Sequence, residues 1–211
     1  MNLLESLRWR HACKRMNGEK VPQEKVDRIL EAISLTPTSL GLQAYKVIVV
    51  ENDELKNEIY DKACQQMPVK ECSHLLIFAS YTQVTEKDLD EYFELIRKRR
   101  KELATDEWCK NYRERIRFFL DREYERMEEW LAQQAHIALG VACVAAADEQ
   151  VDSVPIGGFD PKALNEILKL REQGLSSTVI LPLGYSDAAN DWNAKLPKVR
   201  KDATDFIEII K

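Results

Sequence analysis

Glycine is scarce in this chain, and its scarcity excludes two common classes of nucleotide site. The 211 residues contain 7 glycines. None of them is spaced as G-x-G-x-x-G or G-x-x-x-x-G-K, the patterns that place backbone N–H groups around a dinucleotide or a triphosphate. The sequence therefore excludes a Rossmann-type dinucleotide site and a P-loop.

Paired cysteines, a leader-type segment and a membrane-length apolar run are also lacking. The 5 cysteines form no C-x-x-C pair, so we expect reduced thiols, no metal site and a cytoplasmic location. Glu5, Arg8 and Arg10 near the start of the chain argue against a signal peptide. The longest apolar stretch covers residues 135–147, whereas a bilayer requires about 20 apolar residues, so we expect a buried helix there.

The chain has no excess of positive charge, and its formal net charge is −5. A general binder of nucleic acid or anionic membranes needs a positive field, so we expect neither partner. The basic run 97–101 is flanked by Glu94 and Glu102, and we interpret it as a solvated helix face rather than a docking site for an acidic partner. With 45% hydrophobic residues and no linker, residues 1–211 should form a single domain.

Hydrophobic spacing predicts a chain of mixed helices and strands. Apolar residues recur at i, i+3, i+4 and i+7 within 23–35, which is typical of an amphipathic helix. The alanine-rich segment 130–147 should be the central helix, because small side chains permit close contact on nearly every side. The apolar tail 206–210 is rich in strand-forming residues and needs a cover, such as a second subunit. The expected strands are 45–50, 74–79, 151–155 and 175–183, and the other expected helices are 55–66, 86–129 and 162–170.

Three kinds of segment carry residues suited to a charged, planar ligand. The basic clusters 8–15 and 195–201 lie near opposite ends of an acidic chain, and together they could converge on one phosphate. The glycines in 155–160 allow a flat ligand to lie against bare backbone. Segment 36–43 follows the first long helix with hydroxyls and an amide. Taken singly, these segments are also typical of an exposed face, a β-to-α turn and a capping loop.

In their order and context, these segments resemble the FMN-dependent nitroreductase family. That family opens with R-H/R-S-x-K, continues with P-S/T-S-x-x-x-Q-P-W/Y, and later shows P-I/M-x-G-F and K-x-R. The corresponding residues here are 10–14, 37–45, 155–159 and 198–200. The resemblance covers nearly the whole chain and implies an α+β, nitroreductase-like fold, with a mostly antiparallel or mixed sheet flanked by helices. It also implies a homodimer with two FMN sites at the interface and a C-terminal tail on the partner subunit.

The resemblance implies that both ends of the chain hold the cofactor phosphate. Arg10, Lys198 and Arg200 would bind the FMN phosphate through charge-assisted hydrogen bonds. His11 and Ala12 would lie near the phosphate and the ribityl chain. Alanine replaces the family's usual serine at this position, so one hydrogen bond worth about 0.5 to 1.5 kcal/mol would be missing.

The ring of the flavin would meet polar side chains and bare backbone. The resemblance implies that Lys14 and Gln65 lie near the pyrimidine edge, where an ammonium group favours the reduced ring. Segment 155–158 would form the wall under the ring and present two N–H groups to N5 and O4, and segment 37–39 of the other subunit would close the site. These two segments consist of Pro37, Thr38, Ser39, Pro155, Ile156, Gly157 and Gly158.

The activity that the resemblance implies is that of an NAD(P)H-dependent FMN oxidoreductase. NAD(P)H and a nitroaromatic or quinone-type acceptor would use one pocket in turn, by ping-pong kinetics, because the chain offers no second dinucleotide site. The chemistry would belong to FMN N5, and no side chain is predicted to be catalytic. Two alternatives stay open, a relative with a dedicated pteridine or enone acceptor and a non-catalytic flavin-binding dimer. Gly157 replaces a frequent glutamate, which bears on acceptor selectivity.

Overall fold

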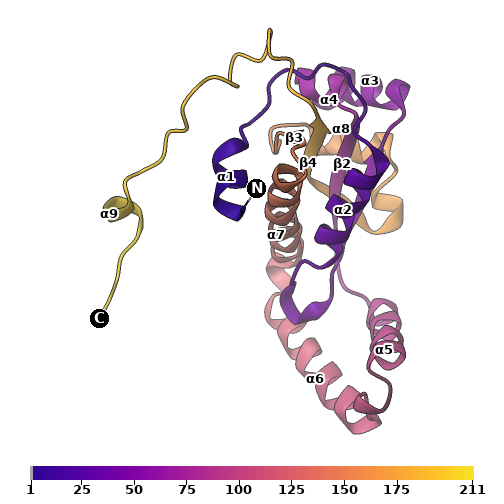
Figure 1. Ribbon diagram of the computed structural model, residues 1–211. Coiled ribbons are helices and arrows are strands. Elements are labelled where there is room, and N and C mark those ends of the chain that lie inside the picture. The colour runs from indigo at the N-terminus through magenta and orange to yellow at the C-terminus, as the bar shows by residue number, and fades with distance from the viewer. Residues whose placement is uncertain (1) are drawn as a thin grey trace.

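The computed structural model describes residues 2–211 and contains an antiparallel sheet with the strand order β1-β2-β4-β3 (Figure 1). The two middle strands are almost continuously apolar and buried, as expected for strands covered on both faces. The expected α+β architecture is confirmed, although the third strand is much shorter than the predicted 151–155. The strands are β1 Tyr45–Val50, β2 His74–Tyr81, β3 Asp152–Ser153 and β4 Leu175–Gly184.

Alternate residues of β2 enter two different hydrophobic cores, one on each face of the sheet. Leu76 and Phe78 pack with residues of α2 and α7, whereas Leu75 and Ile77 pack with residues of α3, α4 and α8. Helices therefore cover both faces. The helices of these two layers are α2 Gln23–Ser34, α3 Asp53–Lys62, α4 Met67–Glu71, α7 Met127–Asp148 and α8 Pro161–Ile167.

Helix α7 is the expected central helix, and it is longer than the apolar run 135–147 suggested. Together with the preceding turn it covers Tyr124–Asp148, a length and composition sufficient to cross a membrane. Its sheet-facing alanines are fully buried against β2 and β4, as in the core helix of a globular protein. On another side Ile137 stays 46% exposed, so the helix also offers an uncovered apolar surface.

Helices α5 Glu86–Arg100 and α6 Asp106–Arg122 form a pair that projects from the sheet (Figure 1). The pair encloses a small core of its own, to which Phe93 and Ile116 belong. The basic residues 97–101 are all exposed, as expected for a solvated helix face, and Arg97 pairs with Asp106 at 2.9 Å.

The two chain ends lie outside the layers. Helix α1 Leu3–Trp9 contacts α7, whereas the C-terminal segment leaves the body and runs apart from it (Figure 1). The tail 206–210, although rich in strand-forming residues, forms no strand in the single chain, which has the short helix α9 Ala203–Phe206 followed by irregular residues. A strand needs a neighbour for its backbone hydrogen bonds, and none is adjacent here. The 3₁₀ turns are η1 Ser39–Gly41, η2 Lys101–Leu103, η3 Tyr124–Arg126 and η4 Arg171–Gln173.

Candidate cofactor site

The two ends of the chain meet in a basic pocket. This cavity of about 360 Å³ contains five of the residues predicted to surround the phosphate and the ribityl chain, brought together from distant parts of the sequence. Its lining includes no carboxylate side chain. The lining residues are Arg10, His11, Ala12, Asn193, Leu196, Pro197, Lys198, Val199 and Arg200.

The charges in the basic pocket are not neutralised by the protein. Arg10 Nε is buried and has no hydrogen-bond partner among residues 2–211. Burial, and then the nearby Arg10 and Arg200, lower the pKa of Lys198 below its ordinary value. Lys198 Nζ donates to the backbone oxygen of Arg8, and the Arg200 guanidinium donates to Val199 O at 2.7 Å. A buried, unpartnered guanidinium donor beside two more cations fits a multiply charged anion such as the FMN phosphate.

His11 lies between two buried carboxylates at the floor of this region. Its Nε2 is 2.8 Å from Asp191 Oδ2, and its Nδ1 is 3.6 Å from Asp152 Oδ1. Burial raises the pKa of Asp152. Burial would also raise the pKa of Asp191, but hydrogen bonds from His11, Ser186 and two backbone N–H groups hold it below its ordinary value. The imidazole is therefore held by carboxylates, and it joins three segments of the chain.

Hydrogen bonds to the backbone connect the segments around residues 12, 153 and 193. Ala12 forms a bridge with Ser153, and its oxygen accepts a 2.8 Å hydrogen bond from Asn193 Nδ2. Lys14 N donates to Asp191 Oδ1 at 3.2 Å, which ties the half-buried Lys14 to the same network. Asp152 of the short strand β3 and the loop residues Asp191 and Asn193 were not predicted from the sequence, because no motif spacing marks them.

A possible metal-binding arrangement is already satisfied by protein groups. The donor atoms of His11, Cys13 and Asp191 lie within 4.8 Å of one another. Burial, followed by the two neighbouring carboxylates, raises the pKa of the Cys13 thiol, which donates to Arg15 O at 3.1 Å. The imidazole is hydrogen-bonded to Asp191, so these groups already have partners without an ion.

Segment 155–158 presents bare backbone next to the sheet. Ile156 exchanges two backbone hydrogen bonds with Ile180 of β4, at 2.9 and 3.1 Å, which fixes the segment. Gly157 and Gly158 are exposed, and neither N–H donates to another group of residues 2–211. A Cβ at Gly157 would meet nothing within 4 Å. Two free donors in open space fit the predicted contact with a flavin ring.

The neighbouring glutamines differ from the prediction. Gln65 Nε2 donates to Asp61 O of its own helix region at 3.0 Å, so the structure does not direct it toward segment 155–158. Gln66 Nε2 instead donates to Gly158 O at 3.2 Å. A contact of Gln65 with the cofactor therefore stays a prediction. Sequence spacing could not distinguish two adjacent glutamines that follow a helix end.

The predicted segment 37–39 is not brought to the basic pocket of its own chain. Ser39 N donates to Gln134 Oε1 at 2.8 Å, near the start of α7. Helix α1, which leads into Arg10, contacts the other end of α7 through Ser6 and Asp148 at 3.4 Å. At about 1.5 Å per residue, Gln134 and Asp148 are roughly 20 Å apart along the axis. One chain therefore holds the two parts of the predicted site at separate places.

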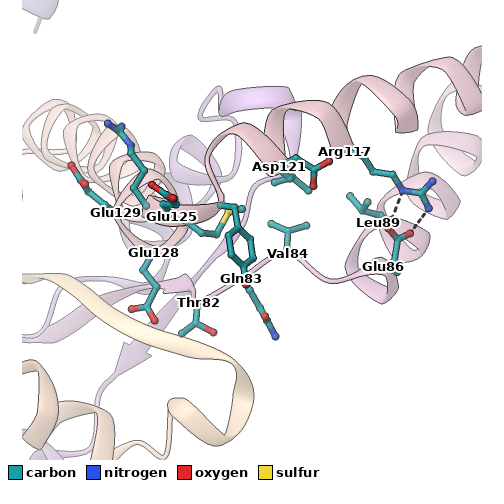
Figure 2. A pocket seen from close by; sticks show the side chains of 14 residues that line it. Thr82, Gln83, Val84, Glu86, Leu89, Arg117, Asp121, Glu125, Glu128 and Glu129 are labelled. Carbon is teal, nitrogen blue, oxygen red and sulfur yellow. Dashed lines mark hydrogen bonds and ion pairs between the residues drawn. The ribbon is translucent and has the colours of Figure 1, made fainter.

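A larger cavity lies elsewhere and has the wrong charge for a phosphate. It measures about 730 Å³ and lies between the β2–α5 turn, α6 and the start of α7 (Figure 2). Glu86 is paired with Arg117 at 2.7 Å, and Figure 2 shows further carboxylates along the wall. The acidic lining residues are Glu86, Asp121, Glu125, Glu128 and Glu129. Despite its smaller volume, the basic pocket is the better candidate for an anionic cofactor.

Comparison with known proteins identifies relatives along nearly the whole chain. Residues 7–185 match the sequence profile described as the nitroreductase family. The Major NAD(P)H-flavin oxidoreductase of Aliivibrio fischeri is 31% identical over 220 residues, covering 99% of this chain and 98% of the relative. The Oxygen-insensitive NAD(P)H nitroreductase of Enterobacter cloacae is 24% identical, covering 95% of each chain.

The fold also has solved counterparts. A nitroreductase-like protein from Streptococcus mutans superimposes with a TM-score of 0.84 at 25% identity. The alignment covers 99% of this chain and 98% of that protein. The arrangement of sheet and helices described above is therefore shared along the full length.

Proposed function

Because the chain belongs to the nitroreductase family and is an FMN-dependent oxidoreductase that uses NAD(P)H, we propose that it reduces nitroaromatic or quinone-type acceptors by two electrons. Bound FMN supplies the chemistry, since it accepts a hydride from NAD(P)H and delivers two electrons to an acceptor. The contribution of the protein is to hold the cofactor, shape the pocket and exclude competing reactions.

The observation that carries this proposal is a buried guanidinium donor without a partner, Arg10 Nε, beside two more cations of the basic pocket. Arg10 Nε is buried without a protein partner, and Lys198 and Arg200 lie beside it. A buried polar donor without an acceptor is costly, so a protein keeps one where a ligand supplies the acceptor. We assign the FMN phosphate to this pocket.

The flavin ring would then extend toward segment 155–158. The free N–H groups of Gly157 and Gly158 are suited to N5 and O4, and Lys14 follows Arg10 on the same stretch of chain. The Gln66 side chain donates to the carbonyl of Gly158, which helps to hold the chain directly after these two donors. This placement supports hydride transfer on the open face of the ring.

A shared pocket for both substrates follows from the same geometry. The sequence has no glycine-rich phosphate loop, so the nicotinamide has no separate site and must stack on the flavin. The oxidised nicotinamide then leaves before an aromatic acceptor occupies the same face. Steady-state turnover should therefore be ping-pong.

We further infer that the chain works as a homodimer. Segment 37–39 lies about 20 Å along α7 from the end next to α1, so it could close the site of a second copy better than its own. Apolar side chains that a monomer leaves bare occur on α1, on α7 and in the tail. These include Leu3, Leu4, Ile137, Phe206, Ile207, Ile209 and Ile210.

Anaerobic reduction tests the proposed function. Purified protein should be yellow, and NADH or NADPH under nitrogen should bleach its flavin absorbance, which a quinone or nitroaromatic then restores. Double-reciprocal plots at several fixed acceptor concentrations should be parallel. A flavin band that neither nicotinamide bleaches would indicate a non-catalytic flavin-binding dimer, and intersecting lines would rule out the shared pocket.

The acceptor is tested by comparing compound classes in the same assay. If an enone or a pteridine is reduced with a kcat/KM at least tenfold above every quinone and nitroaromatic tried, the protein is a relative with a dedicated acceptor. A cytoplasmic location is proposed as well, and cell fractionation with antibody detection tests it. Recovery of the protein in the membrane fraction after salt washing would contradict that location.

A further inference from the structure

The turn that follows segment 37–39 is held in an uncommon backbone conformation. The φ angles are +59° at Leu40, +69° at Gly41 and +47° at Gln43. Leucine and glutamine rarely adopt this left-handed region because their Cβ atoms crowd the backbone. Such a conformation persists only where surrounding contacts determine it. Loop 37–43 has hydrogen bonds of its own, such as that from Gln43 N to Thr38 Oγ1 at 3.0 Å, and further contacts come from outside it.

Two tyrosines from the projecting helices α5 and α6 contact the backbone of this loop. Tyr92 of α5 and Tyr112 of α6 both donate a hydrogen bond to Leu40 O, at 2.9 and 2.8 Å. A carbonyl oxygen has two lone pairs and can accept both bonds at once. Burial, and then the neighbouring Tyr112, raise the pKa of Tyr92 to about 12, so its hydroxyl remains a donor at neutral pH.

Packing contacts surround the two tyrosine hydroxyls and their rings. A Cβ at Gly41 would lie 2.8 Å from the Tyr92 hydroxyl oxygen, so glycine permits this approach. The ring of Tyr112 lies 5.0 Å from that of Trp108 and 6.2 Å from that of Phe93, measured between centroids. The side chain of Leu40 joins the same apolar cluster. The ring of Tyr92 also lies 5.7 Å from that of Phe93, so ring contacts help to orient both donors.

We propose that Tyr92 and Tyr112 are positioning residues for the flavin site of the partner subunit. The proposal rests on the proposed function, in which segment 37–39 closes the site of the second copy. By holding Leu40 O, the two hydroxyls keep loop 37–43 in the shape that meets the partner's cofactor. The helix pair α5–α6 thus acts in trans. If only a fraction of the loop population has that shape, the apparent affinity for FMN falls by the same fraction.

Tyrosine-to-phenylalanine variants remove the hydroxyls and keep the rings. Each single variant, Tyr92→Phe or Tyr112→Phe, leaves Leu40 O one donor, so we expect the Kd for FMN to rise by at most about threefold. The double variant should raise it by about tenfold or more. Tyr60→Phe is the matched control, because the Tyr60 hydroxyl makes no hydrogen bond within residues 2–211. A double variant with the parental Kd would overturn the proposal.

A mixed dimer distinguishes action in trans from a general structural role. One subunit carries Arg10→Ala and Arg200→Ala, the other carries Tyr92→Phe and Tyr112→Phe, and two affinity tags isolate the mixed species. In trans, the tyrosine-variant subunit keeps its own basic pocket and receives an intact loop, so the dimer should bind one FMN with parental affinity. If no site of parental affinity appears, the hydroxyls act within their own subunit and the proposal is wrong.

Amide hydrogen exchange of the apoprotein tests the same proposal in the absence of cofactor. In the double variant, the amides of loop 37–43 should exchange at least about tenfold faster than in the parent, while those of β2 and β4 stay unchanged. Unchanged exchange in the loop would overturn the proposal. If the parent protein binds no FMN, the proposed function fails, whereas the exchange result still decides whether the tyrosines position the loop.

Discussion

The basic pocket and loop 37–43 are two parts of one proposed site, and they are built in opposite ways. The pocket is formed within one chain by Arg10, Lys198 and Arg200, no carboxylate lines it, and the buried Arg10 Nε has no hydrogen-bond partner among residues 2–211. The loop is held by part-buried hydrogen bonds to Gln134 of α7 and to two tyrosines, and none of its residues lines the pocket. In the proposed site, the basic pocket would bind the phosphate of the cofactor, and loop 37–43 would contact a second subunit.

The two parts should respond to different kinds of variant. Changes in the pocket alter the contact with the phosphate and should leave the assembly intact. Changes in the loop, the tail or the exposed apolar faces alter how two chains meet. Flavin binding should respond to both kinds of change, but subunit dissociation should respond only to the second.

The largest effect is expected from deleting residues 204–211. The tail exposes Phe206, Ile207, Ile209 and Ile210, and burying each of these on a partner would contribute up to about 1.5 to 3 kcal/mol. Dimer stability should fall by several kcal/mol, with flavin content falling at the same protein concentration. Sedimentation velocity combined with flavin absorbance measures both. A flavin-bound monomer of the parent protein would contradict the account of the assembly.

The next largest effect is expected in the pocket itself. Arg10→Ala, Lys198→Ala and Arg200→Ala each remove a charge-assisted hydrogen bond worth about 1.5 to 3 kcal/mol. Each Kd for FMN should therefore rise about 10- to 150-fold, while the dimer stays intact. Arg99→Ala is the charge-matched control on the exposed face of α5. Fluorimetric titration of the apoprotein with FMN measures each Kd. Parental affinity in all three variants would refute the phosphate assignment.

A smaller effect is expected from the carboxylates beneath the pocket. Asp191→Asn should lower the free energy of unfolding by about 1 to 3 kcal/mol at neutral pH, because His11 and Ser186 lose an ionised acceptor. The pKa of Asp191 is below its ordinary value of 3.8 in the folded state, so its stabilisation is present above that value and is lost as the pH falls through the folded pKa.

Chemical denaturation of the apoprotein at a series of pH values measures this difference. The gap between the parent and Asp191→Asn should be widest at neutral pH and should close below about pH 3.8. Asp121→Asn, on an exposed position of α6, serves as the control and should show almost no gap. A gap that is constant with pH would mean that the charge of Asp191 does not contribute.

The smallest effect on flavin affinity is expected at Gly157. A side chain there meets open space, so Gly157→Glu should change the Kd for FMN by less than about threefold. Its carboxylate would enter the proposed acceptor pocket and should change the kcat/KM ratio between a quinone and a nitroaromatic by about tenfold. Gly157→Ala is the control, with little change in either quantity. An unchanged kcat/KM ratio in the Gly157→Glu variant would show that acceptors do not bind next to this position.

Much of the fold could be predicted from the sequence because its elements have strong local periodicity. The helix within 23–35 and the strands 45–50 and 175–183 agree with α2, β1 and β4 almost to the residue. The strand at 151–155 is shortened to Asp152–Ser153, because strand length depends on pairing partners that spacing does not reveal.

The site was predictable only in part. The resemblance led to the nitroreductase family and to FMN, both of which the comparisons confirm, while the individual contacts stay predictions. Three features of the supporting framework, Asp191 under His11, Gln66 on Gly158 and the two tyrosines on Leu40, were missed. Each joins residues far apart in the chain without a motif, so only the folded structure brings them together.

The most direct test of the central claim compares FMN with riboflavin, which lacks the phosphate. Apoprotein is titrated with both compounds, for the parent and for the variant carrying Arg10→Ala and Arg200→Ala. If the basic pocket holds the phosphate, the parent should bind FMN at least about 100-fold more tightly than riboflavin, and the variant should nearly lose that preference. A parent that binds both compounds equally, or a variant that keeps the full preference, would contradict the assignment.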